Sequence, residues 1–207
     1  PFQPQFELDD ALRLAEELSA PLKVLSLDIL DREVIISNPA DRCYFCKKAL
    51  FTALTSQAKR DGYTLVFDGT NASDQTDDRP GMKALTELQD LSPLRECGLT
   101  KQTIRQLSKE AGLFTYDKPS YACLATRIPT GTRITGNLLN KIETCEQSLA
   151  HLGYRDFRIR LLDGCARLQL LESQFPQALR QKNQIRELLL PHFKEVLLDL
   201  TPRKGDD

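Results

Sequence analysis

Two cysteines with the spacing of a metal-binding pair, Cys43 and Cys46, are the first residues in the chain whose types and positions could do chemistry. They lie in the run Arg42-Cys43-Tyr44-Phe45-Cys46-Lys47-Lys48. Two thiols at this spacing can bind one metal ion, and the flanking Arg42 and Lys47, together with a helix N-terminus, favour the thiolate form. The pair alone is compatible with half of a zinc site, a redox-active dithiol or two buried cysteines.

A third cysteine, Cys123, adds to this pair because it lies in an irregular segment rather than on an apolar helix face. The segment reads Lys118-Pro119-Ser120-Tyr121-Ala122-Cys123-Leu124-Ala125-Thr126-Arg127. A cubane iron–sulfur cluster normally takes four protein ligands, so three cysteines would leave one iron free for an external ligand such as sulfide. A structural zinc ion would need a fourth protein ligand, and neither His151 nor His192 is obviously placed to supply it.

The other three cysteines fit structural roles. Cys145 falls on the apolar stripe of a helical pattern, Cys165 is next to a hairpin signal, and Cys97 lies between a strand pattern and a helical one. Free cysteine is often simply buried, so we expect these three to contribute to packing rather than to chemistry.

The elements that must position the first two cysteines alternate between helical and strand patterns. Apolar residues at helical spacing predict a helix over residues 8–18, and a buried strand is expected at 22–27. A second helix follows at 46–59 and a second strand at 63–67. This alternation is typical of an α/β fold with a parallel sheet.

Ligand-binding loops in such sheets follow the carboxyl ends of the strands. The polar loop at residues 68–74 has that position. Thr100 can cap the next helix, which Gly112 can end. Residues 113–134, which include Cys123, lack clear periodicity and are interpreted as an ordered active-site crossing.

The pattern changes near Thr135, which can cap a helix that Gly153 closes. Two strands are expected at 157–162 and 166–171, joined by Asp163-Gly164, a strong two-residue hairpin signal. A helix at 183–190 and a strand at 195–200 complete a small α+β domain. The sequence therefore predicts an α/β domain over residues 1–134 and an α+β domain over residues 135–207.

The composition excludes several classes of protein. The 207 residues are 41% hydrophobic and 28% charged, which excludes a disordered chain, and 28 basic residues balance 29 acidic ones to a formal charge of −1. Nothing global therefore favours binding to nucleic acid or to a membrane. No apolar stretch could span a bilayer and no signal peptide opens the chain, so we expect a cytoplasmic protein.

Several longer motifs resemble the LarE family in sequence and in order. They are Asn38-Pro39-Ala40-Asp41-Arg42-Cys43-Tyr44-Phe45-Cys46-Lys47-Lys48, Asp68-Gly69-Thr70-Asn71, Arg79-Pro80-Gly81, Ser92-Pro93-Leu94, Gly98-Leu99-Thr100-Lys101 and Ala122-Cys123-Leu124-Ala125-Thr126-Arg127. The resemblance covers nearly the whole chain.

The resemblance implies an ATP-dependent sulfur transferase of nickel-pincer cofactor biosynthesis. It implies an N-terminal pyrophosphatase-loop (PP-loop) ATP domain, similar to adenine nucleotide alpha hydrolases, and a smaller C-terminal domain. Members of the family adenylate a carboxylate of pyridinium-3,5-biscarboxylic acid mononucleotide with ATP and Mg²⁺, and sulfur then displaces AMP. One type of member sacrifices its own cysteine, while the other delivers a sulfide bound to a [4Fe-4S] cluster held by three cysteines. The set Cys43, Cys46 and Cys123 is similar to the cluster type.

The resemblance also implies roles for other residues. Cys123 and Arg127 would be catalytic, Thr70 and Asn71 would line the nucleotide site, and Lys101 would contact phosphate. Substrate binding would fall to Arg158, Arg160 and Glu146, the two arginines projecting from one strand face. A solvated sheet face explains those arginines almost as well, and an exposed helix position explains Lys101. Where the family often has another glutamate, this chain has Gln169.

One family feature is absent from the printed residues, and two other functions stay open. The Ser-Gly-Gly-x-Asp-Ser phosphate loop is not in the sequence, and we expect it to precede Pro1. The closest alternative is a cluster-dependent tRNA thiolation enzyme, which shares the ATP chemistry and the cluster. A non-catalytic zinc-binding interaction module is a second alternative. The expected partners are the mononucleotide, a sulfide or other sulfur donor, and further copies of the chain, since family members form homo-oligomers.

Overall fold

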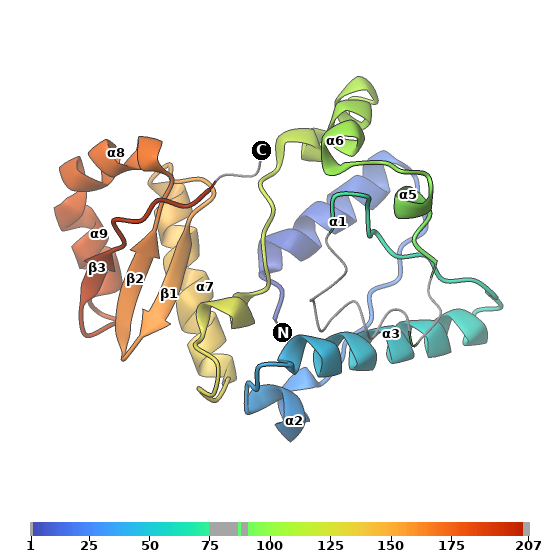
Figure 1. Cartoon of the computed structure of the whole chain (residues 1–207), viewed down its shortest axis with the longest axis horizontal. Helices are drawn as coiled ribbons and strands as arrows, with labels where there is room; N and C mark the ends of the chain where they lie inside the picture. The colour runs from blue at the N-terminus through green and yellow to red at the C-terminus, as the bar shows by residue number, and fades with distance from the viewer. Residues whose placement is uncertain (1, 75–86, 88–90, 205–207) are drawn as a thin grey trace. The chain divides into compact units, whose positions relative to one another are not determined.

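The computed structural model describes residues 2–74, 87 and 91–204, and these divide into two compact units. The sheet unit comprises Pro1–Arg13 and Pro119–Asp207, and the helical unit comprises Leu14–Lys118. The sequence predicts a boundary between two functional domains after residue 134. That boundary stays a prediction, because the compact units are defined by contacts and not by function. Helices and a small sheet together make the chain a mixed α/β protein (Figure 1).

The sheet unit contains a three-stranded sheet of order β1-β2-β3. β1 (Arg158–Leu162) pairs antiparallel with β2 (Cys165–Gln169), and β2 pairs parallel with β3 (Val196–Leu198). The predicted hairpin turn is confirmed, because Asp163 and Gly164 both have positive φ angles, 49° and 86°. A two-residue turn with positive φ at both positions matches the right-handed twist of the strands it joins.

Helices pack on this sheet as the amphipathic patterns predict. α7 (Gly136–His151) begins at Thr135, whose hydroxyl accepts a hydrogen bond from the Leu138 N–H at 3.2 Å, and ends before Gly153 at φ 92°. α7 packs against β1 and against α9 (Lys182–Leu189), and α8 (Phe175–Arg180) packs against α9. The core of the unit is aliphatic; its fully buried side chains include Ile142, Leu149, Ile159, Leu170 and Leu189.

The helical unit contains two longer helices that the sequence predicts. α3 (Arg42–Arg60) carries the cysteine pair in its first turn. α6 (Lys101–Glu110) is capped by Thr100, whose hydroxyl accepts the Thr103 N–H at 3.1 Å, and Gly112 follows it at φ 73°. α1 (Gln5–Glu17) begins in the sheet unit and its last residues belong to the helical unit.

The described part of the helical unit also contains short elements. They are η1 (Ile29–Asp31), α2 (Glu33–Ile36), α5 (Pro93–Glu96) and η2 (Phe114–Asp117). None of them spans enough residues to show helical periodicity, so sequence patterning does not detect them.

The strands predicted at residues 22–27 and 63–67 are wrong for the described part of the chain. Residues 22–27 lie outside any sheet, and the second segment makes a single parallel bridge, between Phe67 and Leu91. Leu22, Leu65 and Phe67 are exposed. An extended segment becomes a strand only when neighbouring strands pair with its N–H and C=O groups, and the described residues supply one such contact.

The crossing at residues 113–134 is irregular, as expected. Its one further helical turn is η3 (Leu124–Arg127), which begins directly after Cys123. Leu124 and Ala125 are fully buried, so this turn is anchored in the core of the sheet unit. The motif Arg79-Pro80-Gly81 lies outside the described residues.

Candidate functional site

Cys43 and Cys46 lie one helical turn apart on α3. This spacing brings their side chains to one face of the helix. Cys43 is exposed and Cys46 is half-buried. The Arg42 guanidinium donates to Asn38 Oδ1 at 2.6 Å and lies 3.6 Å from Cys43 Sγ, which fixes a cationic donor beside that sulfur.

Cys123 is half-buried at the start of η3 and belongs to the sheet unit, whereas the cysteine pair belongs to the helical unit. Within residues 2–74, 87 and 91–204, no three His, Cys, Asp or Glu side chains form a group that could hold a metal ion. The ligand set Cys43, Cys46 and Cys123 therefore stays a prediction. Cys145 contrasts with them, because it is only 1% exposed and burial raises the pKa of its thiol to about 11.

The predicted nucleotide-binding residues come together in the helical unit. Asp68 Oδ1 accepts the Thr70 N–H at 2.7 Å, and Asn71 Oδ1 accepts the Ser73 N–H at 2.9 Å. The Ser73 hydroxyl in turn accepts the N–H of Lys101, the first residue of α6, at 3.0 Å. The loop carrying Thr70 and Asn71 is therefore tied to the N-terminal end of α6.

In the sheet unit, Arg127 and Glu146 form a buried ion pair. Arg127 Nε donates to Glu146 Oε1 at 2.9 Å and Arg127 Nη2 to Oε2 at 3.1 Å, and the two residues are 1% and 4% exposed. The remaining nitrogen of Arg127, Nη1, donates to the Ala122 carbonyl and to the Thr126 hydroxyl, both at 2.9 Å, and lies 3.5 Å from the Cys123 carbonyl oxygen. Two residues predicted from separate segments therefore act as one group beside Cys123.

Tyr121 is a member of this group that the sequence reasoning missed. Its hydroxyl donates to Glu146 Oε2, and its ring centroid lies 4.5 Å from the Arg127 guanidinium and 5.1 Å from that of Arg158. Burial, followed by the charge of Glu146, raises the pKa of Tyr121, so the phenol stays protonated and keeps donating. Since Tyr121 and Glu146 are 25 positions apart, only the fold brings them together.

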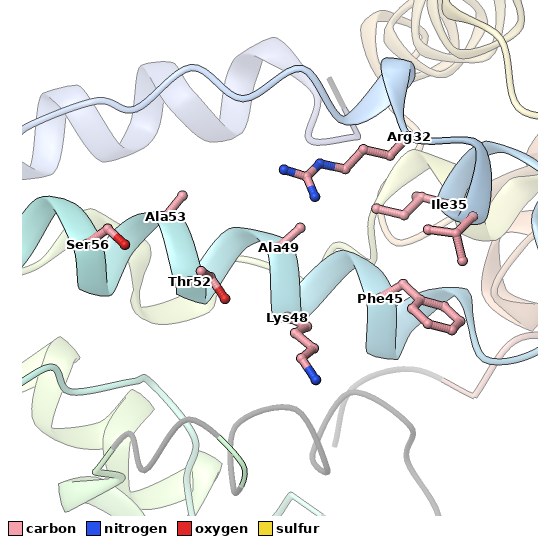
Figure 2. Close-up of a pocket in the computed structure, with 9 residues that line it drawn as sticks. Arg32, Ile35, Phe45, Lys48, Ala49, Thr52, Ala53 and Ser56 are labelled. Carbon is pink, nitrogen blue, oxygen red and sulfur yellow. The ribbon is translucent and has the colours of Figure 1, made fainter.

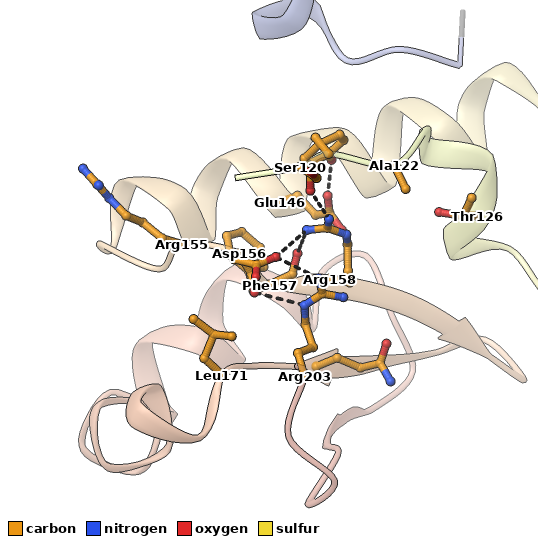
Figure 3. A network of polar contacts seen from close by, with 12 residues as sticks. Ser120, Ala122, Thr126, Glu146, Arg155, Asp156, Phe157, Arg158, Leu171 and Arg203 are labelled. Atoms are coloured by element: carbon orange, nitrogen blue, oxygen red, sulfur yellow. Dashed lines mark hydrogen bonds and ion pairs between the residues drawn. The ribbon is translucent and has the colours of Figure 1, made fainter. Parts of the chain in front are cut away.

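Arg158 is buried and bound mainly to backbone. Its guanidinium donates to the Ser120 carbonyl at 2.6 Å and to the Phe157 carbonyl at 2.7 Å, and lies 3.5 Å from Asp156 Oδ1 (Figure 3). Arg203 holds the same Asp156 carboxylate at 2.8 Å. Arg158 therefore has most of its donors engaged with protein groups.

Arg160 keeps donors available. Its Nε donates to Gln169 Oε1 at 2.7 Å and its Nη1 to the Thr126 carbonyl at 3.2 Å, while Nη2 makes no hydrogen bond within the described part of the chain. Gln169 donates to Asp199 Oδ2 at 2.9 Å, which orients its carbonyl toward Arg160. The family's expected glutamate is thus replaced here by a neutral acceptor.

Arg167 lies directly opposite Arg160 in the hairpin and was missed by the sequence reasoning. Its Nε is buried and has no hydrogen-bond partner among the described residues, and the Asp199 carboxylate is 3.7 Å away. Burial, followed by the charges of neighbouring arginines, lowers the pKa of Arg160. Two like charges on opposite strands are unfavourable unless an anion compensates them.

The signal for Arg167 is present in the sequence. A two-residue turn at Asp163-Gly164 sets the register of the hairpin, so residues equally far from the turn on the two strands are partners. Arg160 and Arg167 satisfy that condition, and the pairing could have been read directly from the turn.

A separate hollow of about 390 Å³ lies along α3 in the helical unit (Figure 2). Its lining is largely apolar, with Arg32 and Lys48 as the cations; the other lining residues are Val34, Ile35, Phe45, Ala49, Thr52, Ala53 and Ser56. The Lys48 amine already donates to Tyr44 and to Glu87. None of the predicted site residues lines this hollow.

Comparisons with known proteins found relatives of similar sequence over most of the chain. A pyridinium-3,5-bisthiocarboxylic acid mononucleotide synthase from Lactiplantibacillus plantarum is 33% identical over 195 residues, which are 94% of this chain and 71% of that protein. Uncharacterised proteins from Synechocystis sp. and Methanocaldococcus jannaschii are 36% and 30% identical over 171 and 201 residues, or 83% and 97% of this chain. No protein-family model matches.

The matched region is shorter than the relatives themselves. It spans 64% of the Synechocystis protein and 77% of the Methanocaldococcus protein. Within the described residues, no helix has both the length and the apolar composition needed to cross a membrane.

Proposed function

Since the chain belongs to the LarE family of pyridinium-3,5-bisthiocarboxylic acid mononucleotide synthases, we propose that it inserts sulfur into a pyridinium mononucleotide during nickel-pincer cofactor synthesis. The observation that carries this proposal is the convergence of Arg127, Glu146, Arg158 and Arg160 on the segment that bears Cys123. These residues come from three separate segments of the sequence, and a merely solvated surface would not require them to meet.

The proposed reaction has two steps. A carboxylate of pyridinium-3,5-biscarboxylic acid mononucleotide attacks the α-phosphate of Mg²⁺-bound ATP and releases pyrophosphate, which gives an acyl-adenylate. Sulfur then attacks the acyl carbon, AMP leaves with the carbon–oxygen electron pair, and a thiocarboxylate remains. Adenylation is needed because an unactivated carboxylate has no adequate leaving group.

The helical unit would supply the ATP-binding part, as a PP-loop domain. Thr70 and Asn71 would line the nucleotide site, with Lys101 near a phosphate as a flexible point charge. The hydrogen bonds that tie this loop to the start of α6 support the assignment, because the N-terminal end of a helix favours negative charge.

Cys43, Cys46 and Cys123 would hold a [4Fe-4S] cluster, which when bound would supply a sulfide on its iron without a protein ligand. Their position outside the core supports this role, since all three residues are exposed or half-buried. Arg127 is fully buried, so it fits a positioning role beside Cys123 better than direct contact with the substrate.

The phosphate of the mononucleotide would bind at the arginine pair Arg160 and Arg167. Both guanidinium groups retain donors, whereas those of Arg158 are mostly engaged by Ser120, Phe157 and Asp156. Two guanidinium groups match the several acceptor oxygens of a phosphate dianion, and a bound phosphate would relieve their mutual repulsion.

The direct test is an anaerobic assay with pyridinium-3,5-biscarboxylic acid mononucleotide, ATP, Mg²⁺ and sulfide, after reconstitution with iron and sulfide. Mass spectrometry should detect a product in which sulfur replaces a carboxylate oxygen, together with AMP. Activity on tRNA but not on the mononucleotide would favour the thiolation enzyme instead. Stoichiometric zinc, with neither product nor AMP, would favour the interaction module.

A further inference from the structure

The segment Ser120–Cys123 is held from two sides by buried arginines. Arg158 binds the Ser120 carbonyl at 2.6 Å, and Arg127 binds the Ala122 carbonyl at 2.9 Å. Between these two anchors, the Tyr121 ring stacks against both guanidinium groups. Arginines therefore hold the backbone carbonyls of Ser120 and Ala122, just before Cys123.

The Cys123 carbonyl itself receives several donors. The Thr126 N–H and the Thr126 hydroxyl donate to it at 2.9 and 2.8 Å, and Arg127 Nη1 lies 3.5 Å away. The same Arg127 nitrogen donates to the Thr126 hydroxyl oxygen, so the hydroxyl proton is directed to Cys123. Arg127 thus contributes to the hydrogen bonding at both the Ala122 and the Cys123 carbonyl.

Glu146 in turn determines the orientation of Arg127. It accepts two hydrogen bonds from the Arg127 fork, a third from the Tyr121 hydroxyl, and a fourth from the Ile159 backbone N–H at 2.8 Å. A buried carboxylate with four donors on its two oxygens has little freedom to move. In this structure the acceptor positions of Glu146 are used by the protein itself.

We propose that Glu146 is a positioning residue that acts through Arg127 to fix the backbone of Cys123. It thereby sets the orientation of the Cys123 thiol and its accessibility to a reagent. A glutamate on α7 would thus control a thiol more than twenty positions earlier in the chain, through the bidentate Arg127 fork. That this control matters for sulfur transfer rests on the proposed function. The linkage from Glu146 through Arg127 to Cys123 does not rest on it.

Alkylation of individual cysteines measures this linkage without any substrate. The full chain, free of metal, is treated with iodoacetamide, and the rates at Cys123 and Cys145 are followed by mass spectrometry of peptides. Cys145 is adjacent to Glu146 on α7 and fully buried, so its rate reports loosening of the whole unit. The exposed Glu187 on α9 provides a matched control for loss of one carboxylate, as Glu187→Gln.

The expected result for Glu146→Gln is an increase of about tenfold in the Cys123 rate, equivalent to about 1.4 kcal/mol. The Cys145 rate rises with any loss of global stability in this variant, but it should stay well below the Cys123 rate, so that the gain at Cys123 is local. Glu187→Gln should match the unmodified protein at both cysteines. Arg127→Lys, which retains the charge but loses the fork, should have the same effect. Because the two residues act in series, the double variant should add nothing to either single one.

An unchanged Cys123 rate in Glu146→Gln, or additive effects in the double variant, would overturn the proposal. If Glu146→Gln brings the Cys145 rate up to the Cys123 rate, global opening accounts for both, and Thr126→Val decides, because it keeps the ion pair and removes only the hydroxyl between Arg127 and Cys123. A faster Cys123 with an unchanged Cys145 then supports the linkage, and an unchanged Cys123 refutes it. A failed sulfur-transfer assay alongside a positive alkylation result would count against the proposed function alone.

Discussion

The Arg127 fork donates to both oxygens of Glu146, at 2.9 and 3.1 Å, where both side chains are almost completely excluded from water. Burying two charges costs free energy that their attraction only partly offsets, and removal of one partner leaves the other charge uncompensated. This asymmetry decides how variants of the pair should behave.

Single variants of the pair should therefore be much less stable than a variant that removes both charges. Glu146→Gln or Arg127→Met should each lower the free energy of unfolding by about 3–5 kcal/mol. In Arg127→Met with Glu146→Gln, the loss should be clearly smaller than the sum, because Gln still accepts the Ile159 N–H. Urea unfolding of the unmodified protein, the two single variants and the double variant measures the coupling between the two residues. Strictly additive losses of stability would contradict this prediction.

Arg160 and Arg167 should govern binding of the substrate phosphate, while Arg158 should govern stability. Arg167→Ala is expected to weaken binding of the mononucleotide by about tenfold or more, measured by calorimetry, with little change in the free energy of unfolding. Arg158→Ala should have the opposite profile, because its guanidinium supports backbone carbonyls. Equal losses of affinity in the two variants, with equal stability, would exclude this division of roles.

Much of the sheet unit follows from local sequence rules. The Thr135 cap and the Asp163-Gly164 turn each depend on a few neighbouring residues, and the structure confirms both. The turn even fixes that Arg160 and Arg167 are partners. Local hydrogen bonding and backbone preference are sufficient for such features.

Features that depend on distant partners could not be predicted in the same way. The segment at residues 22–27 has a strand composition, but composition does not provide the neighbouring strands that make a sheet. Tyr121 and Arg127 carry no local signal that they meet Glu146, since the contact is created by the packing of α7 against β1 and η3. Long-range polar contacts of this kind come from the fold rather than from a motif.

The three predicted metal ligands should be separable from the other cysteines by iron content. After anaerobic reconstitution, Cys43→Ala, Cys46→Ala and Cys123→Ala should each lose most of the [4Fe-4S] signal in Mössbauer or EPR spectra. Cys97→Ala and Cys165→Ala are matched controls and should retain it. A full signal in Cys123→Ala would show that the cluster assignment is wrong.

Burial of Cys145 should make the protein less stable at alkaline pH. Burial raises the pKa of this thiol from its ordinary value of 9.0 to about 11, so between these values the folded protein holds a proton that the unfolded chain has released. Stability from this group is complete below pH ~9 and declines as the pH rises toward ~11, by up to about 2–3 kcal/mol. The free energies of unfolding of the unmodified protein and of Cys145→Ala, measured with urea, should therefore converge across this pH interval. Parallel curves would mean that the thiol does not titrate as its burial requires.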